Sequence, residues 1–261
     1  TCNLLNDLTF KKLFASEETK DITKHFLEDV VGIRPKTIIL RSHQVYSVKK
    51  MASLKKENDI LHTKVDLLVD LGTGQLATIE LQNKLQKFFP ERALFYMAKS
   101  YLLSYNKAKS DKSKSTISKH QSLRSVYGVN IINFKQHPAA MTDEVMHYVL
   151  KNEKYNQTLK NHLSNTDLWT LVFFELPKVH EGSMPILKEW ASLFLNGTVS
   201  DQAPEHLKRA AAFIAFENLE EEEGQLYINF NEREAIRQDE LSGAIEEGIE
   251  RGIEKNNICI T

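Results

Sequence analysis

The chain has 261 residues, of which 41% are hydrophobic and 26% charged, and its formal net charge is −1. This composition is typical of a folded globular protein, and the near-neutral charge excludes a basic surface spread over the whole chain. No apolar run approaches the roughly 20 residues of a membrane helix, and two cysteines exclude a disulfide framework or a four-thiolate zinc site. We therefore expect a cytoplasmic protein without membrane contact.

The first part of the chain is expected to form a helix, a β-rich segment and a hairpin. Hydrophobic residues recur at helical spacing up to Gly32, which ends the helix. The elements predicted in order are a helix over 7–31 with a break at 16–19, a β-rich segment over 36–48, a loop over 49–59, and strands over 63–71 and 76–84.

The second part is expected to add one helix, three strands and three further helices. The elements predicted in order are a helix from Pro90, a Lys- and Ser-rich loop over 106–124, strands over 126–134, 146–150 and 168–176, and helices over 185–195, 204–219 and 231–255. This order predicts an α/β or α+β fold whose sheet is complete by about residue 180. We expect a core over 1–180 and a helical C-terminal region over 181–261.

The hairpin carries the clearest chemical signal. Alternate residues of a strand share a face, so each hairpin strand has one apolar face and one largely polar face. The connection Gly72-Thr73-Gly74, with Gly74 in the left-handed conformation, is a common hairpin loop, and it pairs Asp66 with Glu80. Directly opposite side chains have Cβ atoms roughly 5 Å apart, so two carboxylates are expected side by side.

Two carboxylates in this arrangement point to a divalent metal site. Like charges at opposite positions destabilise a sheet, and Mg²⁺ prefers carboxylate, water and phosphate oxygens as ligands. We expect Asp66 and Glu80 to bind Mg²⁺, or Mn²⁺ in its place. Gln82 can hold the attacking water or a phosphate, and Lys64 or Lys84 can stabilise developing charge. The alternative is an exposed hairpin with a solvated polar face.

The pattern resembles the PD-(D/E)XK nucleases, and within them the nuclease-family transposases and recombination-promoting nucleases of bacteria. Five segments in order carry the resemblance: the opening stretch 6–14, the hairpin pair 65–69 and 79–82, the helix start 92–96, the strand end 174–178 and the terminal helix 244–252. The resemblance implies a restriction-endonuclease-like core, with a mixed sheet flanked by helices. It also implies metal-dependent hydrolysis of DNA during recombination or transposition, with Asp66 and Glu80 as metal ligands.

One position departs from the wider superfamily. Its motif ends in Lys, where this chain has Gln82, and Gln cannot supply positive charge. The closer family also has Gln there, and the hairpin register offers Lys64 as a replacement. The resemblance also makes Asp7 a candidate that reaches the metal or a metal-bound water. The alternative for Asp7 is that it caps the first helix.

Several basic residues are candidates for contacts with DNA. Lys11, Lys84 and Arg92 lie near the matched segments, and Lys112 and Lys114 belong to a basic run that ends at Arg124. Such a run can follow a phosphate backbone. The alternative is a solvated surface loop.

The last predicted helix suggests self-association. Ile245, Ile249 and Ile253 recur every four residues, and this stripe can pair with a second chain to give a homodimer. The alternative is a frayed tail. Two other functions stay open beside the nuclease: a catalytically inactive nuclease fold that binds DNA or itself, and a toxin-like effector built on the same core.

Overall fold

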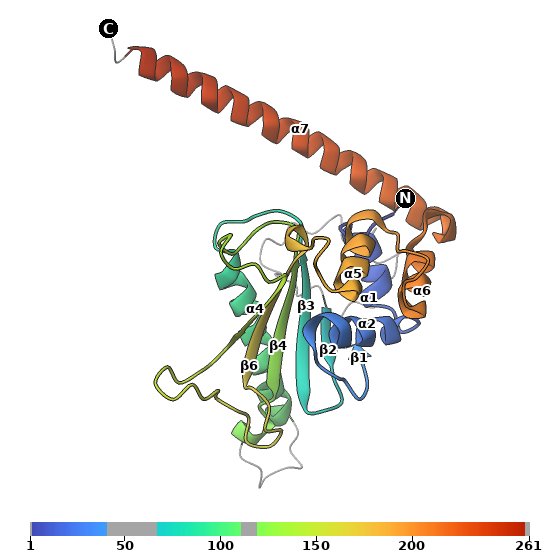
Figure 1. Cartoon of the computed structure of the whole chain (residues 1–261), viewed down its shortest axis with the longest axis vertical. Helices are drawn as coiled ribbons and strands as arrows, with labels where there is room; N and C mark the ends of the chain where they lie inside the picture. Colours follow the sequence, from blue (N-terminus) through green and yellow to red (C-terminus); the bar gives the residue numbers. More distant parts are fainter. Residues whose placement is uncertain (1, 41–66, 111–118, 259–261) are drawn as a thin grey trace. The chain divides into compact units, whose positions relative to one another are not determined.

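The computed structural model describes residues 2–40, 67–110 and 119–258 (Figure 1). The chain forms two compact units, Thr1–Asn218 and Leu219–Thr261. The first unit extends beyond the boundary at residue 180 that the sequence suggested, because helices after that residue contribute Leu187, Trp190 and Leu207 to the main hydrophobic core.

The first unit is built on a mixed six-stranded sheet in the order β1-β2-β3-β4-β6-β5. The strands are β1 (Ile39–Leu40), β2 (Leu67–Asp70), β3 (Gln75–Gln82), β4 (Ser125–Ile132), β5 (Val145–Val149) and β6 (Trp169–Glu175). Strands β3, β4 and β6 are parallel, and the other pairings are antiparallel. The predicted mixed sheet flanked by helices is therefore confirmed.

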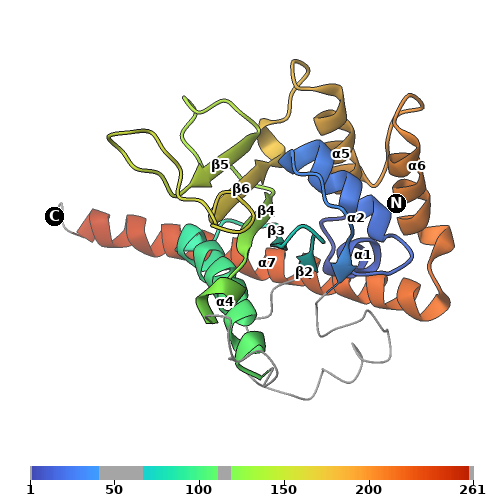
Figure 2. The same ribbon diagram turned by 90° about the horizontal axis from the view of Figure 1, so that it is seen from below.

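Helices cover both faces of this sheet. The α-helices are α1 (Asp7–Phe14), α2 (Lys20–Phe26), α4 (Phe89–Ser110), α5 (Pro185–Asn196), α6 (Glu205–Ile214) and α7 (Glu221–Ile258). The short helical turns are η1 (Leu27–Val31), η3 (Lys119–Ser122), η4 (Leu176–Lys178) and η5 (Phe216–Asn218). Figures 1 and 2 show α4 on one side of the sheet and α1, α2, α5 and α6 on the other.

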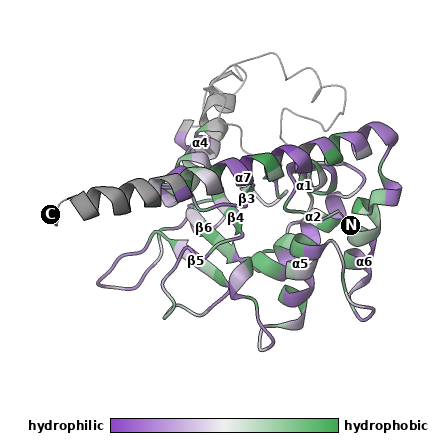
Figure 3. Ribbon diagram, turned by 90° about the horizontal axis from the view of Figure 1, so that it is seen from above, coloured by the Kyte–Doolittle hydropathy of each residue, from purple (hydrophilic) through white to green (hydrophobic). Residues whose placement is uncertain are grey.

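The larger core lies between the sheet and the four-helix layer. Leu67, Val69 and Ile79 belong to it from β2 and β3, together with aromatic residues such as Phe14 and Trp190. Figure 3 shows that the strands are mostly hydrophobic. Because this face is apolar at every second position, the hairpin register cannot slip by one residue without moving the whole set to the other face of the sheet.

Helix α4 buries the opposite face of β3. Leu76 and Thr78 are buried there, so the solvated polar face considered from the sequence is wrong for this part of the hairpin. The close approach depends on Gly128 in β4, where an added Cβ would lie 3.2 Å from the Cβ of Met97. The hairpin is therefore part of a two-sided core.

Three helix boundaries differ from the sequence prediction. One helix was expected over 204–219, but α6 ends at Ile214 and the short turn η5 follows it. The first helix is divided as expected, but α4 continues through residues 106–110, which were predicted as loop. Extending an existing helix through good helix formers costs little, whereas starting a new helix is unfavourable. For the same reason α7 begins at Glu221, ahead of the expected 231.

The connection from β5 to β6 contains a tandem repeat of nine residues that the sequence interpretation missed. Leu-Lys-Asn occurs at 150–152 and again at 159–161. In each copy the second asparagine donates its backbone N–H to the carbonyl of the first at 2.9 Å: Asn156 to Asn152 and Asn165 to Asn161. The donors adopt φ of 58° and 53°, a left-handed conformation that asparagine tolerates well.

The second unit consists mainly of helix α7. Its exposed apolar residues include Leu241, Ile245 and Ile249, whereas the side chain of Ile253 lies outside the described residues. The predicted homodimer through this stripe stays a prediction. Among the described residues, no helix combines the length and hydrophobicity needed to cross a membrane.

Candidate functional site

The candidate site lies at the carboxyl end of β3, where α4 begins (Figure 1). The predicted hairpin register is confirmed over the described ladder, which pairs Leu67 with Ile79. Gly74 has the expected left-handed φ of 79°. Lys64 and Asp66 lie outside the described residues, so the pairing of Asp66 with Glu80 stays a prediction.

Glu80 occupies a rigid position. It is half-buried on β3, an internal strand that pairs with β2 on one side and with β4 on the other. Thr78, Glu80 and Gln82 alternate onto the face covered by α4. The Glu80 carboxylate is therefore held at the edge where the parallel strands end.

The side chain of Gln82 is held by protein groups at both ends. Its Nε2 donates to the carbonyl of Lys84 at 2.8 Å, and its Oε1 accepts a hydrogen bond from Nη2 of Arg92. An amide carries two N–H groups and two acceptor lone pairs, so one of each remains for water or phosphate. The expected contact of Gln82 with water or phosphate stays a prediction.

Arg92 stands on the first turn of α4, between two glutamines and two aromatic rings. Its Nη1 donates to Oε1 of Gln86, and its guanidinium carbon lies 5.3 Å from the ring centroid of Phe89 and 6.0 Å from that of Tyr96. Phe89 and Tyr96 are both buried. The guanidinium group is thus positioned beside Gln82 by packing as well as by hydrogen bonds.

The other basic residues expected to contact DNA differ in their environments. Lys84 is half-buried directly after β3, close in sequence to the site. Lys11 pairs with Asp7 at 2.7 Å, so its charge is already balanced. Lys112 and Lys114 lie outside the described residues. Helix α4 is about 33 Å long, so its last turn lies far from the turn that carries Arg92.

Asp7 does not cap the first helix. The cap is Asn6, whose Oδ1 accepts the backbone N–H of Leu8 at 2.9 Å, and Asp7 is the first helical residue. Helix α1 belongs to the layer on the opposite face of the sheet from α4 (Figure 2). The capping prediction is wrong, and a role of Asp7 at the metal stays a prediction.

A buried polar cluster at the same edge of the sheet was not assigned from the sequence. Glu175, which ends β6, is fully buried and accepts backbone N–H groups from Gln136 at 3.2 Å and His137 at 3.3 Å. Its carboxylate also contacts Nδ1 of His137 and lies 3.4 Å from Nζ of Lys178. This cluster anchors the loop after β4. An acid ending an otherwise apolar strand was its signal in the sequence.

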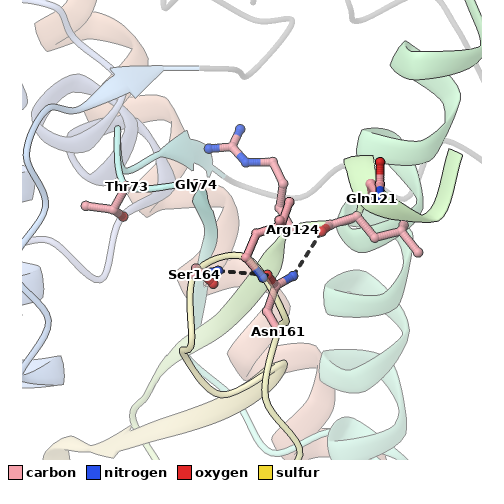
Figure 4. Close-up of a pocket in the computed structure, with 8 residues that line it drawn as sticks. Thr73, Gly74, Gln121, Arg124, Asn161 and Ser164 are labelled. Carbon is pink, nitrogen blue, oxygen red and sulfur yellow. Dashed lines mark hydrogen bonds between the residues drawn. The ribbon is translucent and has the colours of Figure 1, made fainter. Parts of the chain in front are cut away.

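Arg124 has a structural partner at the other end of the sheet. Its two Nη atoms contact both carboxylate oxygens of Asp70, at 2.7 and 2.6 Å, and Asp70 is buried. Arg124 therefore has a role in stabilising the fold, and the contact of the basic run with phosphate stays a prediction. Arg124 also lines a pocket of about 180 Å³ with Thr73, Asn161 and Ser164 (Figure 4). This pocket lies at the hairpin end, away from Glu80.

Among the described residues, Glu80 is the candidate ligand of a divalent metal. The described residues contain no group of three or more His, Cys, Asp or Glu placed to bind a metal ion together. Glu80 offers hard oxygen donors of the kind that Mg²⁺ and Mn²⁺ prefer. The chemistry of the donor set therefore fits a divalent metal with Glu80 as one ligand and Asp66 as the expected second.

A mixed sheet between two helical layers, with an acid and a glutamine at the end of an internal strand, defines a nuclease-like α/β core. The family model of the PD-(D/E)XK nuclease family transposases matches residues 4–244. The chain belongs to this family, and its sheet and helices are those of a restriction-endonuclease-like fold. The comparisons with curated proteins and with solved structures gave no match.

Proposed function

We propose that the protein is a metal-dependent DNA endonuclease that hydrolyses phosphodiester bonds during recombination or transposition in the cytoplasm. Membership of the nuclease-family transposases supports DNA as the substrate. The observation that carries the proposal is Glu80-x-Gln82 at the carboxyl end of β3, in the register that was expected to bring Asp66 opposite Glu80.

Each residue of the proposed site has a separate task. Asp66 and Glu80 hold Mg²⁺ or Mn²⁺ through carboxylate oxygens. When bound, such a metal lowers the pKa of a coordinated water and neutralises charge on the phosphoryl group. The remaining N–H and lone pair of Gln82 orient the water or a phosphate oxygen, while Lys64 or Lys84 stabilises negative charge.

The fold keeps this arrangement rigid. Glu80 is fixed by ladders on both sides of β3, and Gln82 by its bonds to the carbonyl of Lys84 and to Arg92. Catalytic groups held in place before the reaction need no reorganisation in the transition state. A loop placement of the same residues would lack this advantage.

Cleavage of supercoiled plasmid tests the proposal. The full chain is incubated with plasmid in Mg²⁺ and, separately, in EDTA, beside the variants Asp66→Asn and Glu80→Gln. We expect the wild type to nick plasmid in Mg²⁺ but not in EDTA. We expect the cleavage rate of each variant to be at least about 100-fold lower, because each removes stabilisation of the transition-state charge.

A matched variant controls for the loss of one carboxylate. Asp201→Asn changes an exposed acid between α5 and α6, in the layer opposite α4, and should cleave as the wild type does. If neither the wild type nor any variant nicks the plasmid, but the wild type retards DNA in a gel, the result would instead support an inactive nuclease fold that binds DNA. Nicking that persists in Glu80→Gln would refute the proposed site.

A further inference from the structure

The charge of Arg92 is not balanced by any acid among the described residues. Its hydrogen-bond partners there are the neutral side chains of Gln82 and Gln86, and its Nε is buried without a hydrogen bond. Arg124 shows the contrasting case in the same molecule, since both of its Nη atoms contact the carboxylate of Asp70.

An unbalanced cation in a half-buried place is costly. Moving a charge out of water is unfavourable unless an opposite charge or several hydrogen bonds compensate for it. Arg92 is partly buried, and the rings of Phe89 and Tyr96 restrict its plane. A guanidinium group held in this way is ready to receive an anion, and its fork of donors matches a phosphate well.

The position of Arg92 connects this charge to the candidate site. It donates to Gln82, the position at which the wider superfamily carries its lysine. Glu80 lies two residues before Gln82 on the same face of β3, so the Cα atoms of Glu80 and Gln82 are about 6.6 Å apart. A phosphate bound beside Glu80 is therefore near the side chain that holds Arg92.

We propose that Arg92 is a catalytic residue that binds the scissile phosphate and supplies, from α4, the positive charge that Gln82 lacks. The inference rests on the proposed nuclease function and assigns to Arg92 the task that the register had offered to Lys64. Gln82 acts as a positioning residue, because it orients the guanidinium group through its Oε1.

The chemistry needs no change in the protonation of Arg92. The oxygen of one water forms a bond to phosphorus, and the bond from phosphorus to the leaving oxygen breaks. The attacking water loses a proton to solvent, and the leaving oxygen takes one up. Arg92 stays protonated and donates N–H groups to a non-bridging oxygen, where negative charge increases.

The first test compares cleavage by Arg92→Gln, Arg92→Lys and the double variant Gln82→Lys/Arg92→Gln. We expect Arg92→Gln to cleave plasmid in Mg²⁺ about 100-fold or more slowly, and Arg92→Lys to recover part of the rate. The double variant returns a lysine to the superfamily position and should also recover part of it. All three should keep the urea unfolding midpoint of the wild type.

The second test reads phosphate contact without catalysis. Binding of duplex DNA by the wild type and by Arg92→Gln is measured in EDTA over a range of salt concentrations. Because Arg92→Gln loses one phosphate contact, the slope of log K against log salt should be smaller in magnitude by about 0.9 in this variant. Arg209→Gln is the control, since Arg209 pairs with Asp21 in the opposite helical layer and should change neither slope nor cleavage.

The outcomes separate this inference from the proposed function. Cleavage by Arg92→Gln at the wild-type rate, or an unchanged salt slope, overturns the role of Arg92 even if the wild type is an active nuclease. Loss of activity in Lys64→Ala alone would assign the charge to Lys64 and also overturn it. If the wild type never cleaves but the slope falls, the catalytic part fails with the nuclease and the phosphate contact stands.

Discussion

Removing Arg124 from its ion pair with Asp70 should be one of the more destabilising single substitutions in the first unit. The Asp70 side chain is 7% exposed and that of Arg124 is 26% exposed. Replacing Arg124 by Gln removes both charged contacts and leaves a buried carboxylate, whose remaining contacts include the backbone N–H of Gly72 at 3.1 Å.

The expected loss follows from burial. Removing one partner of a fully buried pair costs about 3–5 kcal/mol. Because a quarter of the Arg124 side chain is exposed, water can partly solvate the remaining charge, and we expect about 2–3 kcal/mol for Arg124→Gln. The double variant Asp70→Asn/Arg124→Gln has no buried charge at this position, and it should lose at least about 1 kcal/mol less than the single variant.

Urea unfolding of the full chain at neutral pH measures these differences, provided that the m value is the same in each variant. A change below about 0.5 kcal/mol for Arg124→Gln would refute the reasoning, as would a double variant that is less stable than the single one. Either result would mean that solvent already screens the pair.

Three further predictions concern the packing and titration of the first unit. Gly128→Ala should lower stability by about 1–3 kcal/mol, because the new methyl group would meet Met97; thermal unfolding measures it, and unchanged melting would mean that α4 can shift. Desolvation opposes ionisation of Asp21, but the hydrogen bond and charge of Arg209 lower its pKa below the ordinary value of 3.8. Arg209→Gln should therefore lose at most about 1 kcal/mol at neutral pH, and this loss should disappear as pH falls through the lowered pKa of Asp21; a constant difference across a pH series of urea titrations would contradict this. Burial raises the pKa of Tyr127 above its ordinary value of 10.0, so the contribution of Tyr127 to stability is intact below that value and is lost as pH rises through the higher folded pKa. Tyr127→Phe should thus weaken the loss of stability that sets in as pH rises above about 10, and an identical loss in both proteins would count against it.

The parts of the fold that depend on short-range signals could be predicted from the sequence. The hairpin register follows from a loop of Gly72-Thr73-Gly74 and a period of two, and both are local. The break in the first helix and its end at Gly32 are also local signals. These features need no knowledge of what packs against them.

The environment of the candidate site depends on contacts that no local pattern specifies. The residue pattern predicts a contact of Gln82 with water or phosphate, but it does not predict the hydrogen bond from Arg92, which forms because the chain turns back to begin α4 beside β3. Likewise, the partner of Arg124 is 54 positions away in sequence. Residue types indicated which groups carry charge, whereas only the tertiary arrangement distinguishes the balanced arginine from the unbalanced one.

The tandem turns between β5 and β6 were a local signal that went unused. The repeated Leu-Lys-Asn and the second asparagine of each copy are visible in the sequence. Asparagine at a repeated position is typical of turns with left-handed backbone. Comparing the segment with itself at a spacing of nine residues would have predicted both turns.

Titration calorimetry of Mn²⁺ binding to the full chain tests the central claim that Asp66 and Glu80 form one metal site. The account predicts binding by the wild type and by Asp201→Asn, and affinities at least about 10-fold weaker in Asp66→Asn and in Glu80→Gln. Wild-type affinity in either of the last two variants would contradict it.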